Sequence, residues 1–376
     1  MLVLTRIQKQ LLIWSVGLSF LGASYSWAES IRVFTWQGYV QPEEIAAVNQ
    51  LLKSSGYDYE IEVITPWAEG PEQMFNVIRS GRADISFLTL NYLKMQDARL
   101  LRLLQPIDIR SPRLGNYHKL LDILKTIPMG MQNDQVYYIP WAGGAYGIWA
   151  DMNKVSSDEL PDSVNKLWAP RWKGHLSLSS GQIQPNIALT SMALGKTPFY
   201  LNSIKEYGRL RMYLAADSDI QQKLNQLYQQ VSYFWNSAPQ VHDSVELIAS
   251  YGPAVSTWNA SGGNWRLLNL KEGNTVWLDT INFHKNLSGK KLEAAEIFAN
   301  YFIGRIVQNR AVLQLGLVAA SEEAVVLSEQ FRPGNFFKED MFWPPYWKGA
   351  DNVMKSMSEK AMRAWKLQSQ QALTKQ

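Results

Sequence analysis

The 376-residue chain contains no cysteine and only four histidines. The missing cysteines exclude disulfide bonds, thiolate metal sites and a cysteine nucleophile. No two of the histidines stand three or four residues apart, so the spacing of paired histidine ligands on one helix is also absent. We therefore expect neither a metal nor a cofactor, and we expect His175 and His284 to be surface residues or hydrogen-bonded core residues.

Strong charge and long apolar runs are missing from residues 29–376. This part has 35 Lys and Arg against 33 Asp and Glu. Because its net charge is nearly zero, we do not expect nucleic acid or an anionic membrane surface as a partner. The apolar segment 247–255 is short and is interrupted by Ser250, Gly252 and Pro253, which is not the pattern of a spanning helix. Phosphate loops, dinucleotide fingerprints and Gly-x-Ser-x-Gly elbows are absent, while a Ser/His/Asp set with distant members stays open.

The first 28 residues have the pattern of a secretory signal peptide. Arg6 and Lys9 precede an apolar run over 11–21, and Ser26 and Ala28 are small residues at the positions that a signal peptidase inspects. The run is shorter than the ~20 residues that a spanning helix needs. We expect export and cleavage after Ala28, with an uncleaved N-terminal anchor as the alternative.

Strands and helices alternate in the first part of the mature chain. Alternating, β-rich segments predict strands over 31–36, 59–64 and 84–88. Apolar residues at helical spacing after Pro42, and a helical pattern over 72–80, predict a helix between each pair of strands. This β-α-β-α-β order favours parallel strands in an α/β sheet, and the chain length predicts two domains.

Further elements are expected along the rest of the chain. Glycines among aromatic residues over 143–149 indicate either a strand whose backbone is in close contact with neighbouring atoms, or a hinge. Residues 167–179 read as a helix end and then a strand, and further strands are expected at 255–259 and 275–279. The sequence predicts helices over 292–304 and from residue 352 onward, the second as a terminal helix docked on the body.

Aromatic residues gather at the predicted strand ends. In open α/β sheets ligands bind outside the carboxyl ends of the strands. Rings next to a carboxylate suit a cationic or amine ligand, since each cation–π contact contributes ~0.5–2 kcal/mol. Core packing of the rings, sugar binding and turn capping by the carboxylate are the alternatives. The residues placed at predicted strand ends are Trp36, Tyr39, Trp258, Trp277 and Asp279.

Four motifs, three of which contain these residues, follow one another in the order and spacing of a known family. They are FTWQGYV at 34–40, LWAPRWKG at 167–174, WNAS at 258–261 and WLD at 277–279. Through them nearly all of the mature chain resembles periplasmic solute-binding proteins of the spermidine/putrescine-binding group, the ligand receptors of polyamine-type ABC transporters.

The resemblance implies an α/β, type II-like fold of two hinge-connected lobes with central mixed β-sheets. It implies that residues 29–138 and 261–310 form lobe 1 and residues 139–260 and 311–376 form lobe 2, with crossings near 138–149 and 258–263. It further implies a monomeric periplasmic receptor that encloses a small amine, organic cation or polyamine-like solute and presents it to ABC permease subunits in the inner membrane. Such a receptor catalyses no reaction.

The resemblance also implies which residues line the cleft, with Asp279 pairing with an ammonium group of the ligand. Those residues are Trp36, Tyr39, Thr89, Trp258, Trp277 and Asp279.

The chain departs from the family at several ligand contacts. The two acidic contacts of polyamine binders fall at Gly181 and Gln184, and two tyrosines fall at Asn91 and Leu317. Losing two carboxylates removes the partners of a second or third ammonium group, which is costly to bury unpaired. We therefore expect a smaller ligand that is singly charged or amide-bearing.

Neutral side chains complete the expected site. We include Asn91, Gly181 and Gln184 among the ligand-binding residues, and Gln182, Gln184 and Asn186 offer neutral hydrogen bonds. Two other functions stay open: a periplasmic sensor of the same fold that docks on a membrane receptor, and a secreted hydrolase.

Overall fold

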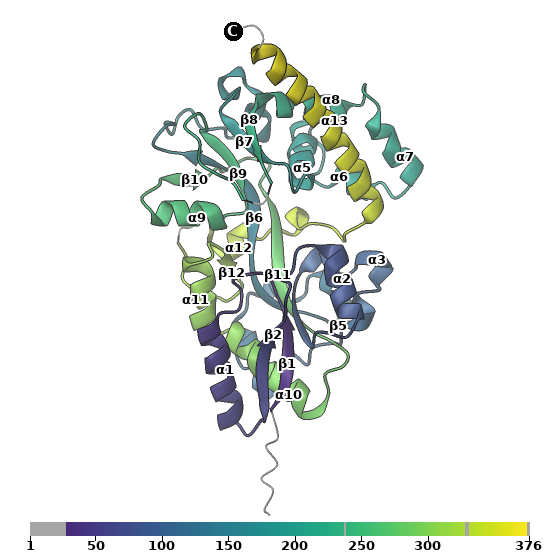
Figure 1. Ribbon diagram of the computed structural model, residues 1–376, viewed down its shortest axis with the longest axis vertical. Helices are drawn as coiled ribbons and strands as arrows, with labels where there is room; N and C mark the ends of the chain where they lie inside the picture. The colour runs from purple at the N-terminus through teal and green to yellow at the C-terminus, as the bar shows by residue number, and fades with distance from the viewer. Residues whose placement is uncertain (1–27, 237, 328–330, 374–376) are drawn as a thin grey trace, which may run out of the picture.

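The protein consists of two lobes stacked along its long axis, in a computed structural model that describes residues 28–236, 238–327 and 331–373. Strands β6 (Ile139–Asp151) and β11 (Thr275–Phe283) run through the middle of the molecule, and β6 continues from one lobe into the other (Figure 1). The predicted signal peptide lies outside the described residues, apart from Ala28. No helix within the described ranges combines the length and the apolar character needed to cross a bilayer.

One mixed sheet of ten strands continues through both lobes. Its order is β2-β1-β3-β11-β6-β9-β7-β8, and β10 and β12 also pair with β6. β1 is parallel to β2 and β3, whereas β11 is antiparallel to β3 and β6. The remaining strands are β1 (Glu29–Phe34), β2 (Tyr59–Val63), β3 (Ile85–Thr89), β7 (Leu176–Ser179), β8 (Val231–Trp235), β9 (Leu247–Ser250), β10 (Trp265–Leu267), β12 (Val318–Ala319) and the separate pair β4 (Met131–Gln132) and β5 (Gln135–Val136).

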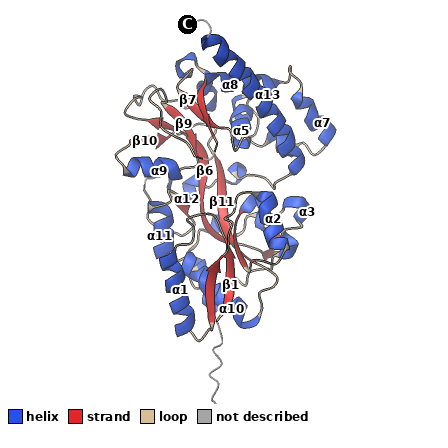
Figure 2. Ribbon diagram, in the orientation of Figure 1, coloured by secondary structure: helices blue, strands red, loops and turns tan. Residues whose placement is uncertain are grey.

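Helices flank the strands in both lobes (Figure 2). With the mixed sheet they make the two-lobed α/β architecture that the sequence predicts. The helices are α1 (Pro42–Ser54), α2 (Pro71–Arg79), α3 (Met95–Ala98), α4 (Asp122–Lys125), α5 (Gln184–Ala193), α6 (Tyr200–Ser203), α7 (Tyr207–Arg211), α8 (Asp219–Gln230), α9 (Pro253–Ala260), α10 (Gly289–Phe302), α11 (Arg305–Leu313), α12 (Pro333–Phe336) and α13 (Lys348–Leu373).

Most of the predicted elements are present. The expected β-α-β-α-β order appears as β1 to β3 with parallel pairing, and the predicted helices at 292–304 and from 352 appear as α10 and α13. The strand expected at 255–259 is wrong, because this segment is helix α9. Gly252, with φ 106°, turns the chain at its start, and Pro253 suits the first helical turn, so helix initiation outweighs the β preference of Val255, Thr257 and Trp258.

Each lobe has its own hydrophobic core. Along β6 the first core ends at Ala145 and the second begins at Tyr146, within the predicted crossing at 138–149. The chain leaves the second core after Leu270 and rejoins the first at Val276, and it crosses again between Phe342 and Ala350. The assignment of residues to lobes stays a proposal, and core membership supports placing the later boundaries at 270–276 and 342–350.

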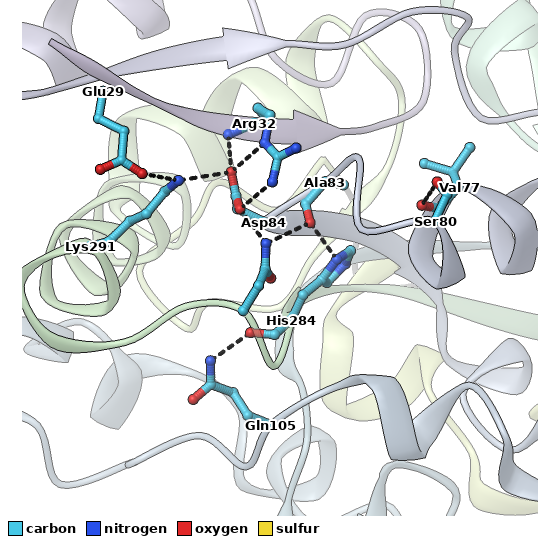
Figure 3. Close-up of polar contacts among 10 residues, drawn as sticks. Glu29, Arg32, Val77, Ser80, Ala83, Asp84, Gln105, His284 and Lys291 are labelled. Carbon is cyan, nitrogen blue, oxygen red and sulfur yellow. Dashed lines mark hydrogen bonds and ion pairs between the residues drawn. The ribbon is translucent and has the colours of Figure 1, made fainter.

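A buried carboxylate fastens three elements of the first lobe. Asp84 is fully buried and accepts hydrogen bonds from the backbone N–H of Arg32 at 2.8 Å and from its Nε at 2.9 Å (Figure 3). Lys291 of α10 lies 3.5 Å away and also pairs with Glu29. Nearby, His284 bonds the Ala83 carbonyl and the Ser86 hydroxyl, and burial lowers its pKa to about 4, as expected for a neutral core histidine.

We expect the Asp84→Asn variant to lose about 2 kcal/mol of unfolding free energy near neutral pH, because Arg32 and Lys291 lose their buried counter-ion. Burial alone would raise the pKa of Asp84, but the hydrogen bonds from Arg32 and the charge of Lys291 hold it below its ordinary value. The contribution of the Asp84 carboxylate to the unfolding free energy is therefore complete above about pH 4 and is lost at more acidic pH. Urea unfolding near pH 7 and pH 3 measures this, and an equal penalty at both pH values would contradict it.

Candidate functional site: the interlobe cavity

A cavity of about 760 Å³ lies between the two lobes. The first lobe contributes the turn after β1, the start of α2, the end of β3 and part of β11. The second contributes the loop after β7 with the start of α5, the end of β9 and the start of α13. The lining includes Trp36, Tyr39, Glu69, Glu72, Thr89, Asn91, Tyr92, Gly181, Gln182, Gln184, Tyr251, Trp277, Asp279, Tyr346, Lys348, Asp351 and Lys355.

Asp279 is the one deeply buried lining carboxylate that lacks a cation. It is 2% exposed, and its two oxygens accept hydrogen bonds from the Tyr39 hydroxyl at 2.5 Å and the Thr89 hydroxyl at 2.6 Å. No lysine, arginine or histidine in the described parts of the chain forms an ion pair with it. Burial raises the pKa of Asp279 to about 6, although the hydrogen bonds from Thr89 and Tyr39 act in the opposite direction. The carboxylate is therefore mostly ionised at neutral pH.

Antiparallel pairing brings Asp279 to the edge where β3 ends. We expected Asp279 to end a strand, but β11 continues to Phe283. Asp279 stands opposite Thr89, the last residue of β3, and the pairing of β11 with β6 shifts register directly after it. Asp279 therefore lies beside the carboxyl end of a strand, but that strand is its neighbour β3 and not β11.

The turn after β1 is anchored so that Tyr39 reaches Asp279. Gly38 has φ 84°, in the left-handed region that favours glycine. Arg310 of α11 donates to the carbonyl oxygens of Gly38 at 3.2 Å and Tyr39 at 2.6 Å, and it pairs with Glu44 of α1. The Tyr39 ring packs on that of Trp141, with centroids 4.3 Å apart.

The Trp277 indole lies against a strand residue without a side chain. Gly144 of β6 stands opposite Trp277 in the antiparallel ladder, and a Cβ at Gly144 would lie 2.7 Å from Cζ2 of the indole. A Cβ at Gly143 would lie 2.2 Å from the Trp277 carbonyl oxygen. The close backbone approach that the sequence predicts here is confirmed, and it places the ring in the cavity wall.

Three tyrosines that the sequence analysis did not select also line the cavity. Tyr92 follows Asn91 directly, so the ring that the resemblance expects at position 91 is supplied one residue later. Burial raises the pKa of Tyr92, and the negative charges of the lining carboxylates Asp279 and Asp351 act in the same direction. Tyr251 donates to Gln182 Oε1 at 2.5 Å, and Tyr346 packs edge-on against Tyr92.

A second carboxylate lies in the wall formed by the terminal helix. Asp351 is 7% exposed and accepts a hydrogen bond from Gln184 Nε2 at 2.6 Å. The Tyr346 hydroxyl donates to it at 3.3 Å, and Lys355 Nζ lies 2.9 Å from its Oδ2. Asp351 is not evident as a site residue from the sequence, since an aspartate four residues before a lysine on an amphipathic helix has the pattern of a surface pair.

Two contacts join the start of α13 and the segment before it to the first lobe. Lys348 forms an ion pair with Glu72 of α2, and the Tyr346 N–H donates to the Asn91 carbonyl at 2.9 Å. These contacts hold the connecting segment 342–350 against the first lobe at the α2 side of the cavity.

Eight of the nine predicted site residues line this one cavity. Trp258 is the exception: it lies on α9 and packs on Trp265, with ring centroids 5.5 Å apart. Asn186 is buried behind the cavity wall and bonds Tyr146 and the Ser179 carbonyl, whereas Gln182 and Gln184 line the cavity. Leu317 lines a separate cavity of about 710 Å³. The eight residues are Trp36, Tyr39, Thr89, Asn91, Gly181, Gln184, Trp277 and Asp279.

We expect Asp279→Asn to stabilise the ligand-free protein near pH 7.5, by up to about 2–3 kcal/mol, because the ionised carboxylate has no cation. The pKa of Asp279 is higher in the folded than in the unfolded chain, so this carboxyl group favours folding below about pH 4 and loses that effect as the pH rises through 6. Urea unfolding of both proteins at pH 4.5 and 7.5 measures the difference. A variant less stable than wild type at both pH values would show that the charge is compensated within the protein.

The Gly144→Ala substitution should displace the Trp277 ring and lower the free energy of unfolding by about 1–3 kcal/mol, since the added Cβ overlaps the indole. Near-UV circular dichroism and urea unfolding report the two effects. Gly208→Ala on α7 is the matched control, because no atom lies within 4 Å of its added Cβ. If both variants behaved alike, the proposed support of Trp277 would be wrong.

Comparisons with known proteins agree with this architecture. The family described as bacterial extracellular solute-binding protein matches residues 95–336, which is more than half of the chain. No curated protein matches. A spermidine/putrescine ABC transporter substrate-binding protein, PotD of Streptococcus pneumoniae, is similar in structure with TM-score 0.67, 16% identity, and coverage of 90% of this chain and 99% of that one.

Two further structures are similar at low sequence identity. The TpPotD lipoprotein of Treponema pallidum has TM-score 0.65 and 12% identity over 89% of this chain and 99% of its own. The Atu4243–GABA receptor has TM-score 0.60 and 13% identity over 90% and 96%. The structural likeness shows a shared fold, and the family match over residues 95–336 shows more: the chain belongs to the bacterial extracellular solute-binding proteins.

Proposed function

We propose that the protein is the periplasmic receptor of an ABC importer and captures a small organic amine in the interlobe cavity. The observation that carries the proposal is Asp279, a buried carboxylate held by two hydroxyl groups and without a cationic partner among the described residues. Burying such a charge costs several kcal/mol unless a counter-ion joins it. The ammonium group of a ligand supplies that counter-ion.

The rings around Asp279 support a cationic ligand. Trp36, Tyr39, Tyr92 and Trp277 line the same cavity. A ring face attracts a cation within ~6 Å of its centre by ~0.5–2 kcal/mol, and a charge-assisted hydrogen bond contributes ~1.5–3 kcal/mol. A few such contacts reach ~8 kcal/mol, which corresponds to micromolar affinity when ordering costs stay small.

The two-lobed construction supports capture by closure. A ligand that touches both walls of the cavity makes more contacts when the lobes close, so it shifts the protein toward the closed state. The strands β6 and β11 and the segment 342–350 connect the lobes and are the elements about which they would turn.

The proposed cellular location of the protein and the proposed delivery of its ligand are supported by the sequence and by the similar proteins. The predicted signal peptide supports export, and the family is named for extracellular solute binding. Similar structures are named for spermidine/putrescine transport and for GABA, which carries one amino group. We therefore infer a monomeric periplasmic receptor that delivers an amine to ABC permease subunits in the inner membrane.

Titration calorimetry of the purified protein with n-butylamine, GABA, putrescine and spermidine tests the proposal. We expect micromolar binding of at least one monoamine and a loss of about 100-fold in Asp279→Asn, since a charge-assisted contact of ~3 kcal/mol is removed.

Trp258→Ala serves as the control variant, because Trp258 lies outside the cavity and its loss should leave the affinity unchanged. Wild-type affinity in Asp279→Asn, or no binding of any amine, would overturn the proposed site. Nanomolar binding of spermidine would overturn the preference for a singly charged ligand.

A further inference from the structure

We infer that Lys355, which pairs with Asp351 in the cavity wall, takes the place that a second ammonium group of the ligand would occupy. Lys355 thereby restricts the ligand to one cationic group. This inference rests on the proposed function and deepens it by naming the residue that selects monoamines over diamines.

Asp351 is a carboxylate positioned to receive a cation. It lines the same cavity as Asp279 from the opposite lobe, and its side chain is 9% exposed. Gln184 and Tyr346 hold its two oxygens by hydrogen bonds of 2.6 and 3.3 Å. These two donors keep the carboxylate in the wall whether or not Lys355 is present.

Lys355, which lies on the same helix, already pairs with this carboxylate. Its Nζ lies 2.9 Å from Asp351 Oδ2, one helical turn along α13. Lys355 is among the lining residues and its side chain is 59% exposed, so its charge lies beside Asp351 at the place where a second ammonium group would pair with that carboxylate. A diamine bound at Asp279 would meet an acidic group that is already neutralised and a positive charge beside it.

Neither of the other polyamine-type acidic positions holds a carboxylate, since they are Gly181 and Gln184. At Gly181 a Cβ would lie 2.4 Å from the backbone oxygen of Asn236, so an aspartate there requires the chain to shift. Gln184 directs its amide to Asp351. For a second ammonium group, the cavity wall therefore offers only two carboxylates with hydrogen-bonding partners, Asp351 and Glu72. Each of them already forms an ion pair with a lysine.

The remaining lining charges leave one site for a cation. Glu72 pairs with Lys348, and Glu69 is exposed to solvent, where its charge is screened. Asp279 alone is buried and unpaired among the described lining residues. Tyr92 lines the cavity together with Asp279 and Asp351.

The experiment compares n-alkylamines with α,ω-diamines of the same length, from propane-1,3-diamine to hexane-1,6-diamine, by titration calorimetry near pH 7.5. In wild type the monoamine of a pair should bind at least as tightly as the diamine. Lys355→Met, with Lys355→Gln as a second neutral variant, should raise diamine affinity relative to monoamine affinity roughly tenfold. The double variant Lys355→Met/Asp351→Asn should lose this gain.

Two controls separate this effect from a general change in charge. Lys355→Arg keeps the positive charge and should keep the wild-type preference. Lys366→Met removes a lysine from the exposed side of the same helix, outside the cavity, and should leave the preference unchanged.

The outcomes distinguish the inference from the proposed function. An unchanged preference in both neutral variants, while Asp279→Asn still weakens binding about 100-fold, would overturn the role of Lys355 and leave the amine receptor intact. A gain that persists in the double variant would also overturn it, because the second ammonium would then not bind at Asp351. If no amine bound to wild type, the proposed function itself would fail.

Discussion

The arrangement of this protein depends on one buried negative charge that is matched by no positive charge among the described residues. Two hydroxyl groups hold the carboxylate of Asp279, and they satisfy its oxygens without neutralising it. Such a group lowers the stability of the ligand-free protein, since a buried ion is costly outside a close ion pair. The contrast with Asp84 is informative, because that carboxylate has Arg32 and Lys291 beside it and fastens the first lobe. One buried aspartate has two cations beside it, and the other has none among the described residues.

The sheet brings the open carboxylate to the boundary between the lobes. Strand β11 runs antiparallel beside β3, so a residue in the middle of one strand meets the end of the other. Gly143 and Gly144 let β6 and β11 approach closely enough for the Trp277 ring to lie in the wall. The opposite wall comes from the loop after β7 and from α13, which the chain reaches only after its last crossing. In the proposed function, binding at Asp279 is coupled by geometry to the distance between the lobes.

Much of this could be predicted from the sequence, and the failures have physical causes. Alternation of apolar residues located β1 to β3, and motif resemblance located eight residues of one cavity. Trp258 was misplaced because Pro253 starts a helix where the side chains favour a strand. Asp351 was missed because its pairing with Lys355 has the spacing of a solvent-exposed helix pair, and only the docking of α13 buries it. Tyr92 was missed by one residue, an offset that the short 3-10 turn after β3 determines. Local patterns do not specify which distant segments share a cavity.

The central claim is that a ligand ammonium group joins an uncompensated carboxylate. It is tested most directly by counting the protons that binding releases. Titration of the protein with n-butylamine at pH 6, in buffers of different ionisation enthalpy, measures this number, and the amine itself stays protonated at this pH. Because the pKa of Asp279 is about 6 in the free protein and falls when a cation binds, we expect release of about half a proton per ligand, and none in Asp279→Asn. Binding of the amine to the wild-type protein without proton release would contradict the account.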